Sequence, residues 1–366
     1  MAREEPNPLR RGWTTGACAA AAARAAYAAL LTGAFPDPVT IRLPRGHKPS
    51  FPLVLAELDQ RGARAGIIKD AGDDPDVTHG ATVIAEVAWG APGSGIRFAA
   101  GEGVGIVTRP GLQLAVGEPA INPAPRAMIR EALTDFAEAN GAAAPDVIVT
   151  IAIPGGAALA EKTMNARLGI VGGLSVLGTT GIVVPYSCAS WVHSIHRGID
   201  VARAAGLDHI AAATGSTSER AVQRLYALPD HALIDMGDFV GGTLKYLRGH
   251  PVARLTLAGG FAKMAKFAAG HLDLHSSKSR VDPALLTGML AAAGADDATL
   301  GAAAAGDSAG AVLEAAGAWA PALADGIARR AREVALATLS GATAVEVAII
   351  GRAGDFLARV GVEGRS

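Results

Sequence analysis

The chain has 366 residues, with 33 basic and 34 acidic side chains and a formal net charge of −1 at pH 7. This balance disfavours nucleic acid as a partner, because polyanion binders carry an excess of basic residues. Two cysteines, Cys18 and Cys188, are too few for a disulfide framework or a cysteine-based zinc site, so we expect a reducing, cytoplasmic setting. The length predicts two domains.

Membrane insertion and export are also disfavoured. The most apolar early run covers residues 17–31 and contains Arg24. A spanning helix needs about 20 apolar residues, and a signal peptide needs a cleavage site, for which no clear candidate follows. We therefore expect a protein without a membrane partner.

The first third of the chain predicts a helix followed by strands. Thr14 or Thr15 can cap a helix whose alanine-rich body ends at Gly33. Alternating or short apolar stretches then predict strands at residues 39–43, after 51, at 83–87, 96–98 and 105–108. Residues 123–140 predict a helix, with Pro125 near its start.

The pattern changes after Asp146, where short apolar strands alternate with helices. Four strand–glycine–helix units begin at residues 147, 210, 232 and 255, and a last strand covers 344–350. Such units predict a parallel sheet with helices on both faces. We therefore expect an α+β domain over residues 1–145, with mainly antiparallel strands, and a Rossmann-like three-layer α/β domain over 146–366. The second domain includes an alanine-rich helical segment, 282–340.

Ligands of open parallel sheets bind at the carboxyl ends of the strands, where glycines let the backbone come close. Asp235 can accept from ribose hydroxyls or cap the next helix. The predicted cofactor-binding residues at these ends are Gly155, Gly156, Thr214, Gly215, Asp235 and Gly237.

Three other stretches attract attention. Gly101–Gly105 resembles a nucleotide-binding glycine loop, but strand-like residues follow it instead of a helix, so a hairpin is favoured. The acidic run from Lys69 to His79 lacks the spacing of a calcium loop and is either a solvated turn or a functional loop. His271 and His275 have no evident third ligand, so we expect them to form hydrogen bonds and expect no protein-bound metal.

Six longer blocks together resemble one family, the cobalt-precorrin-5B C(1)-methyltransferases (CbiD). The resemblance runs in order from about residue 9 to 276, with a looser C-terminal region, and departs locally at 184–190. The blocks are residues 12–23, 69–80, 101–112, 117–126, 165–183 and 259–276.

This resemblance implies methyl transfer in anaerobic cobalamin (vitamin B12) biosynthesis. S-adenosylmethionine would donate a methyl to C-1 of the cobalt-corrinoid cobalt-precorrin-5B, giving cobalt-precorrin-6A. Cobalt would arrive with the substrate, and neighbouring pathway enzymes are further expected partners. Two alternatives stay open, a non-catalytic corrinoid carrier and a nucleotide-dependent oxidoreductase of corrin synthesis.

Methyl transfer from sulfonium to carbon needs alignment, and a base can assist by removing a macrocycle proton. The candidate catalytic residues are Asp70, Asp73, His79 and Glu102, with Glu118 as a further carboxylate. The carboxylate arms of the substrate need cationic or hydrogen-bonding partners, although each candidate could equally be a solvated surface group. The predicted substrate-binding residues are Thr14, Thr15, Arg109, Arg126, Arg167, Lys263, His271 and His275, with Lys266 as an additional cation.

Overall fold

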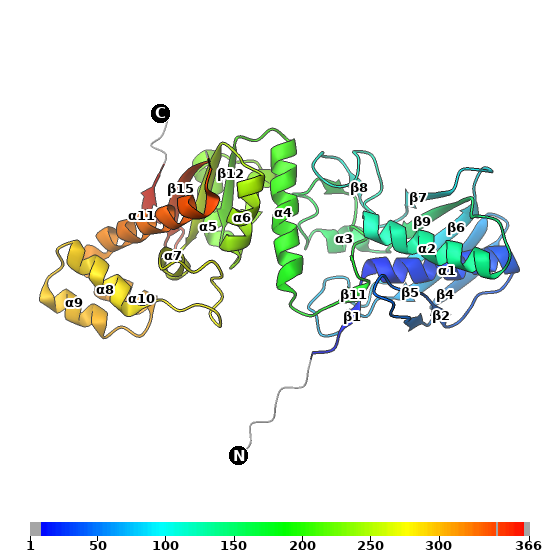
Figure 1. Ribbon diagram of the computed structural model, residues 1–366, viewed down its shortest axis with the longest axis horizontal. Helices are drawn as coiled ribbons and strands as arrows, with labels where there is room; N and C mark the ends of the chain where they lie inside the picture. Colours follow the sequence, from blue (N-terminus) through cyan, green and yellow to red (C-terminus); the bar gives the residue numbers. More distant parts are fainter. Residues whose placement is uncertain (1–8, 342, 362–366) are drawn as a thin grey trace, which may run out of the picture. The chain divides into compact units, whose positions relative to one another are not determined.

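The computed structural model describes residues 9–341 and 343–361 (Figure 1). The chain forms two compact units, the first ending at Cys188 and the second beginning at Ala189. No helix in these described ranges combines the length and apolarity needed to cross a bilayer.

A five-stranded sheet forms the centre of the first unit. Its order is β4 (Leu55–Asp59), β5 (Gly62–Ile68), β6 (Thr82–Trp89), β9 (Val147–Ala152) and β7 (Ile96–Ala100). All neighbours are antiparallel except β7 and β9. The predicted α+β character with mainly antiparallel strands is confirmed.

Two helices, α1 (Thr15–Thr32) and α2 (Pro123–Ala139), pack in this unit, and α1 contacts both α2 and the sheet strands β5 and β6 (Figure 1). Thr14 caps α1 by accepting from the Ala17 amide, and Gly33 ends it in the left-handed conformation. Alanines fill most of α1 and are fully buried, since only short side chains allow neighbours this close on every side. Burial also raises the pKa of the Cys18 thiol to about 12, which keeps this residue a packing group.

The remaining elements of the first unit are short. Three two-stranded ribbons are antiparallel, and two of them join segments far apart in sequence. They are β1 (Gly12–Trp13) with β11 (Ile182–Val183), β2 (Val39–Thr40) with β3 (Ser50–Phe51), and β8 (Ile106–Val107) with β10 (Ile170–Val171); a short helix, α3 (Gly156–Ala160), follows β9.

The second unit contains the predicted parallel sheet. Its order is β13 (Leu233–Asp235), β12 (His209–Ala213), β14 (Arg254–Gly260), β15 (Ala344–Ile350) and β16 (Phe356–Val360), of which only β16 is antiparallel. Alternate strand residues face two separate apolar clusters. One cluster includes α5 (Ser216–Tyr226), and the other includes α4 (Cys188–Ala204), α6 (Val240–Gly249), α7 (Phe261–Ala268) and α11 (Ala320–Leu339). The three-layer prediction is confirmed.

The alanine-rich segment is helical, as expected, and packs beside the second sheet's helices. Besides α11 it holds α8 (Pro283–Ala292), α9 (Asp297–Ala304) and α10 (Ala309–Ala315). Leu286, Leu290 and Val312 anchor it in the same apolar cluster as α7. It therefore extends the core of the second unit.

The structure divides the chain at a different place from the predicted boundary near 145. The run Val147–Ile153 is the central strand β9 of the first sheet and does not belong to the parallel sheet. A continuous apolar run fits any buried strand, so its composition could not identify its partners. After Gly105, the chain does turn back antiparallel, with Ile106 bridged to Pro119, but on its other side β8 pairs with the distant β10, which was not expected.

A buried charge network lies toward the amino-terminal ends of the parallel strands. Glu346 is 2% exposed and accepts hydrogen bonds from Tyr226, Thr256 and Arg359. Burial opposes its ionisation, but these hydrogen bonds outweigh burial and lower its pKa. His209 beside it has a pKa lowered to about 4 by burial and by the Arg254 charge. This network stabilises the sheet away from its carboxyl ends.

Candidate active site

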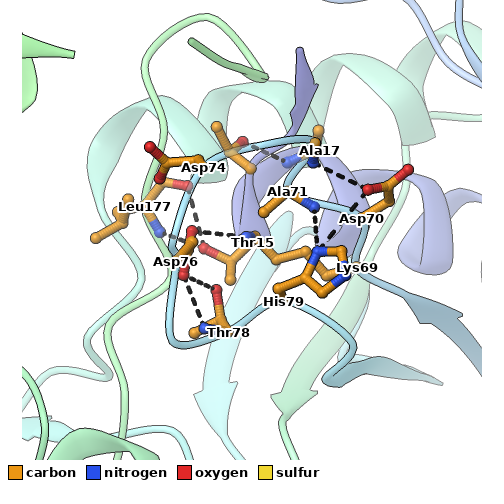
Figure 2. A network of polar contacts seen from close by, with 12 residues as sticks. Thr15, Ala17, Lys69, Asp70, Ala71, Asp74, Asp76, Thr78, His79 and Leu177 are labelled. Atoms are coloured by element: carbon orange, nitrogen blue, oxygen red, sulfur yellow. Dashed lines mark hydrogen bonds and ion pairs between the residues drawn. The ribbon is translucent and has the colours of Figure 1, made fainter. Parts of the chain in front are cut away.

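The acidic loop of residues 69–80 is organised around a buried ion pair (Figure 2). Lys69 is 1% exposed, and its ammonium donates to Asp76 over 2.7 Å. The other Asp76 oxygen accepts from the amide and the hydroxyl of Thr78. Burial raises the cost of the Asp76 charge, but the bonds from Lys69 and Thr78 outweigh it and lower its pKa. The loop is therefore an ordered structure and not a solvated turn.

Asp70 and Asp73 are both engaged by Arg10. The Arg10 guanidinium binds both Asp70 oxygens, and the Arg10 amide donates to Asp73 over 2.6 Å. The Asp70 carboxylate also accepts from the Gly72 amide. The hydrogen bond from Arg10 lowers the pKa of Asp70 to about 2. Such a weakly basic carboxylate is poorly matched to proton removal near neutral pH, so the geometry favours an orienting role.

His79 is oriented by the backbone of the same loop. Its Nδ1 accepts from the Ala71 amide over 3.0 Å and lies 3.8 Å from an Asp70 oxygen (Figure 2). Because Nδ1 accepts, the neutral ring carries its proton on Nε2. The exposed imidazole is thus prepared to donate a hydrogen bond, a different role from the predicted base.

The first turn of α1 is held by another part of the chain. The Thr15 hydroxyl donates to the Leu177 carbonyl and accepts from the Leu177 amide, while the Gly16 amide donates to the same carbonyl. Thr14 Oγ1 accepts from Ala17. Both threonines are buried, so their hydroxyls hold the framework beneath the loop. Their contact with substrate stays a prediction.

Three glycines allow backbone segments to touch behind Glu102. A Cβ on Gly103 would lie 1.9 Å from the Ile153 carbonyl oxygen, and a Cβ on Gly156 or Gly173 would lie 2.3 Å from Gly103 atoms. Asn165 ties this cluster together by donating to the Gly173 carbonyl over 3.1 Å. The exposed Glu102 has one long contact, 3.4 Å from its Oε1 to the Gly155 amide.

One extended stretch, residues 169–186, connects all these parts; we call it the connecting segment. Along its length it pairs with residues 106–107, 103–105, 120–122, 14–16, 12–13 and Asp74 in turn. Five of the six recognised sequence blocks therefore converge within the first unit. Their proximity defines our candidate active site.

The predicted cationic side chains differ in how many hydrogen bonds and ion pairs they already make within the protein. Arg126 donates to the carbonyls of Ile121 and Pro119 and pairs with Glu118, so it fastens a loop. Arg167 is half-buried and has interactions of its own. Arg109 has no ion pair or side-chain hydrogen bond within the described ranges, and its aliphatic stem covers Gly169. Arg109 is therefore the cation best prepared to bind an anionic group.

A second group of predicted residues lies at the carboxyl edge of the parallel sheet. Lys263 donates to the Thr214 carbonyl and lies 3.0 Å from Asp238 Oδ1. Two backbone hydrogen bonds join the loop that carries His271 and His275 to the region where α6 begins. The Leu272 carbonyl accepts from the Gly241 amide, and the Leu274 amide donates to the Asp238 carbonyl. The residues at or next to this edge are Thr214, Gly215, Asp235, Gly237, Lys263, His271 and His275.

Gly155 and Gly156 do not belong to that edge, because β9, which they follow, lies in the first sheet.

Two residues of the candidate sites were not predicted from the sequence. Arg10 precedes the recognised block, so nothing marked it as the partner of Asp70. Trp191 covers Gly237 and donates to the Asp235 carbonyl over 3.2 Å, while 46% of it remains exposed. For Trp191 the sequence offered only the residue type, one of four tryptophans in the chain. No cluster of three metal-ligating side chains occurs among the residues that the structure describes.

Comparison with known proteins places this site in context. Residues 2–185 match the family model CbiD, and residues 273–361 match the model of the CbiD C-terminal domain. Proteins named cobalt-precorrin-5B C(1)-methyltransferase are 56% identical in Brucella anthropi, over 98% of this chain and 97% of that one, and 58% identical in Bradyrhizobium sp., over 96% and 94%. A solved cobalamin biosynthesis protein (cbiD) from Archaeoglobus fulgidus is 29% identical, with a TM-score of 0.40 over 69% of this chain and 77% of that one.

These relatives are methyltransferases by name, and the likeness extends over both units. The chain belongs to the CbiD family.

Proposed function

We propose that this protein transfers a methyl group from S-adenosylmethionine to C-1 of cobalt-precorrin-5B, giving cobalt-precorrin-6A, in the cytoplasmic anaerobic route to cobalamin. The proposal depends on the relatives named for this C-1 methylation, which are 56% and 58% identical to this chain over nearly its whole length. The pairing of five sequence blocks with the connecting segment supports it, because a single reaction needs its binding and catalytic loops close to one another.

The chemistry is a displacement at the methyl carbon. The conjugated ring supplies the electron pair for the new carbon–carbon bond, and the sulfur–methyl bond breaks with its pair remaining on sulfur. The transfer depends mainly on holding donor and acceptor in line. In this proposal, His79 Nε2 and Arg109 bind substrate carboxylates, and Glu102 accepts a macrocycle proton.

We further propose that the methyl donor binds at the carboxyl edge of the second sheet. The helices α5, α6 and α7 begin there, and none of them has a side chain capping its first turn. The Gly241 amide of α6 already donates to the Leu272 carbonyl, so the proposal depends on the starts of α5 and α7. Thr14, Asp282, Asp296 and Ser308 cap α1, α8, α9 and α10, whereas α2, α3 and α11 also begin without a side-chain cap. Free amides at a helix start bind anionic groups, and the methionine carboxylate of the donor is such a group. Trp191 adds an aromatic surface beside this edge.

The decisive experiment is anaerobic incubation of the protein with cobalt-precorrin-5B and methyl-labelled S-adenosylmethionine, followed by mass measurement of the corrinoid. We expect the addition of one labelled methyl group, located at C-1 by NMR. Binding of the corrinoid without any gain in mass would contradict the proposal and leave a carrier role.

Glu102→Gln should lower kcat by on the order of 100-fold with little change in KM, because the amide keeps the shape but cannot accept the proton. Turnover in the same assay measures the effect. Glu138→Gln, at an exposed position late in α2, is the matched control and should leave kcat unchanged. A Glu102→Gln enzyme with kcat within twofold of the parent would remove Glu102 from the mechanism.

Gly215→Val should weaken S-adenosylmethionine binding by at least about tenfold, because the new side chain would stand among the free helix starts. Gly215 suits this test because its backbone is extended and a Cβ placed on it would meet no atom within 4 Å, so folding should not suffer. Calorimetric titration measures the affinity. Gly288→Val, on the exposed side of α8, is the control. Unchanged affinity of the Gly215→Val protein would argue against this edge.

A further inference from the structure

The ribbon formed by β8 and β10 is apolar on both of its faces, although only one of them is buried. Val107 and Ile170 are cross-strand partners whose side chains are buried in a local cluster with Leu114. Because side chains alternate along strands, the next pair, Ile106 and Val171, points to the opposite face. There Ile106 is 36% exposed and Val171 is 57% exposed. Polar residues usually occupy such an outward face.

This outward face continues onto a third segment. Pro119 bridges to Ile106 on the side away from Val171, so Val171, Ile106 and Pro119 form a row across three chain segments. Directly opposed residues have their side chains on the same face of a sheet. We call this row the apolar platform. It consists of two β-branched residues and a proline, whose side chains have little rotational freedom to lose on binding.

A cation lies beside the platform. The Cβ and Cγ of Arg109 lie over Gly169, two residues before Val171 on the same segment; a Cβ on Gly169 would be 2.6 Å from both. Arg109 has no acidic partner among residues 9–341 and 343–361, in contrast to Arg126, which is held by Glu118 and two carbonyls. The stem of Arg109 therefore starts close to the apolar row, and its guanidinium has no acidic partner among the described residues.

We propose that the apolar platform contacts the face of the corrinoid ring and that Arg109 binds one of its peripheral carboxylates. This inference rests on the proposed function and specifies the substrate surface of that site. A corrinoid is a flat ring with apolar faces and carboxylates around its edge, so its chemistry complements the platform and the guanidinium. A guanidinium binds carboxylates well because its planar fork matches two oxygens.

The platform is tested with Val171→Asp and Ile106→Asp, which place a charge on exposed positions and should not disturb the core. Val54→Asp is the matched control, because Val54 is also an exposed valine of the first unit, at 50%. Arg109→Met keeps the aliphatic stem over Gly169 and removes the charge. Affinity is measured by titration with cobyrinic acid, a stable carboxylated corrinoid, and KM and kcat with cobalt-precorrin-5B.

We expect each platform variant and Arg109→Met to weaken cobyrinic acid binding and raise KM by about tenfold or more, with S-adenosylmethionine affinity retained. Val54→Asp should behave as the parent.

Parental cobyrinic acid affinity in both aspartate variants would overturn the inference, as would failure of the parent protein to bind cobyrinic acid. A dimeric parent that becomes monomeric in the variants, with corrinoid affinity unchanged, would assign the platform to a second copy of the chain. If the parent transfers no methyl but shows the expected binding pattern, the proposed reaction fails and the platform stands.

Discussion

Asp76→Ala should lower the free energy of unfolding by about 3–5 kcal/mol, because it leaves the buried ammonium of Lys69 without its counter-charge. Lys69 is 1% exposed and cannot turn to solvent without moving the loop that it begins. Thr78 would lose its hydrogen-bond acceptor at the same time. Denaturant unfolding followed by circular dichroism measures the change.

Two further variants separate the charge from the hydrogen bonds. Asp76→Asn keeps an oxygen that can accept from Thr78 and should lose less stability than the alanine variant. The double variant Lys69→Met with Asp76→Leu removes both charges and should recover much of the loss, since an apolar pair of similar volume can replace a buried ion pair. If Asp76→Ala unfolds at the parental denaturant concentration, Lys69 has another way to satisfy its charge and the ion pair does not hold the loop.

Gly103→Ala should destabilise the first unit by more than about 4 kcal/mol or prevent soluble expression. Its φ of +71° costs a side chain about 1–3 kcal/mol, and the new Cβ would collide with the Ile153 carbonyl at 1.9 Å. Relief would require movement of residues 153–156, which follow β9 and begin α3, away from Gly103. The unfolding free energy and the yield of soluble protein measure this effect.

Gly172→Ala separates conformational strain from collision. Gly172 also has a left-handed backbone, with φ of +88°, but a Cβ placed on it would meet no atom within 4 Å. It should therefore lose only about 1–3 kcal/mol. Equal losses in the two variants would mean that the close approach of Gly103, Gly156 and Gly173 has no energetic weight.

Local signals in the sequence predicted much of the fold. The capping hydroxyl and the final glycine of α1 act within a few residues, and the glycine turns of β12, β13 and β14 mark each strand end directly. The partners of β9 and β8 could not be predicted, because pairing depends on segments far away in the chain. The boundary prediction failed for the same reason, since β9 is apolar enough for either sheet.

The candidate site was only partly predictable. The acidic loop and the glycine blocks stood out by composition, but composition cannot tell a charge with a partner from one without. Asp70 is held by Arg10, and Arg126 by two carbonyls and Glu118, whereas Arg109 is paired with none of the described residues. These differences arise from tertiary contacts.

The alanines of α1 have a thermodynamic consequence for the site. Alanine has no side-chain rotamers, so burying the alanines of this helix costs backbone entropy alone. The same lack of rotamers leaves the alanine positions with no alternative side-chain arrangements through which the helix axis could shift. Thr14 and Thr15, at its start, are therefore fixed to a part of the core with very little conformational freedom, and the connecting segment bound to them at Leu177 and Gly181 is held in place before any ligand arrives.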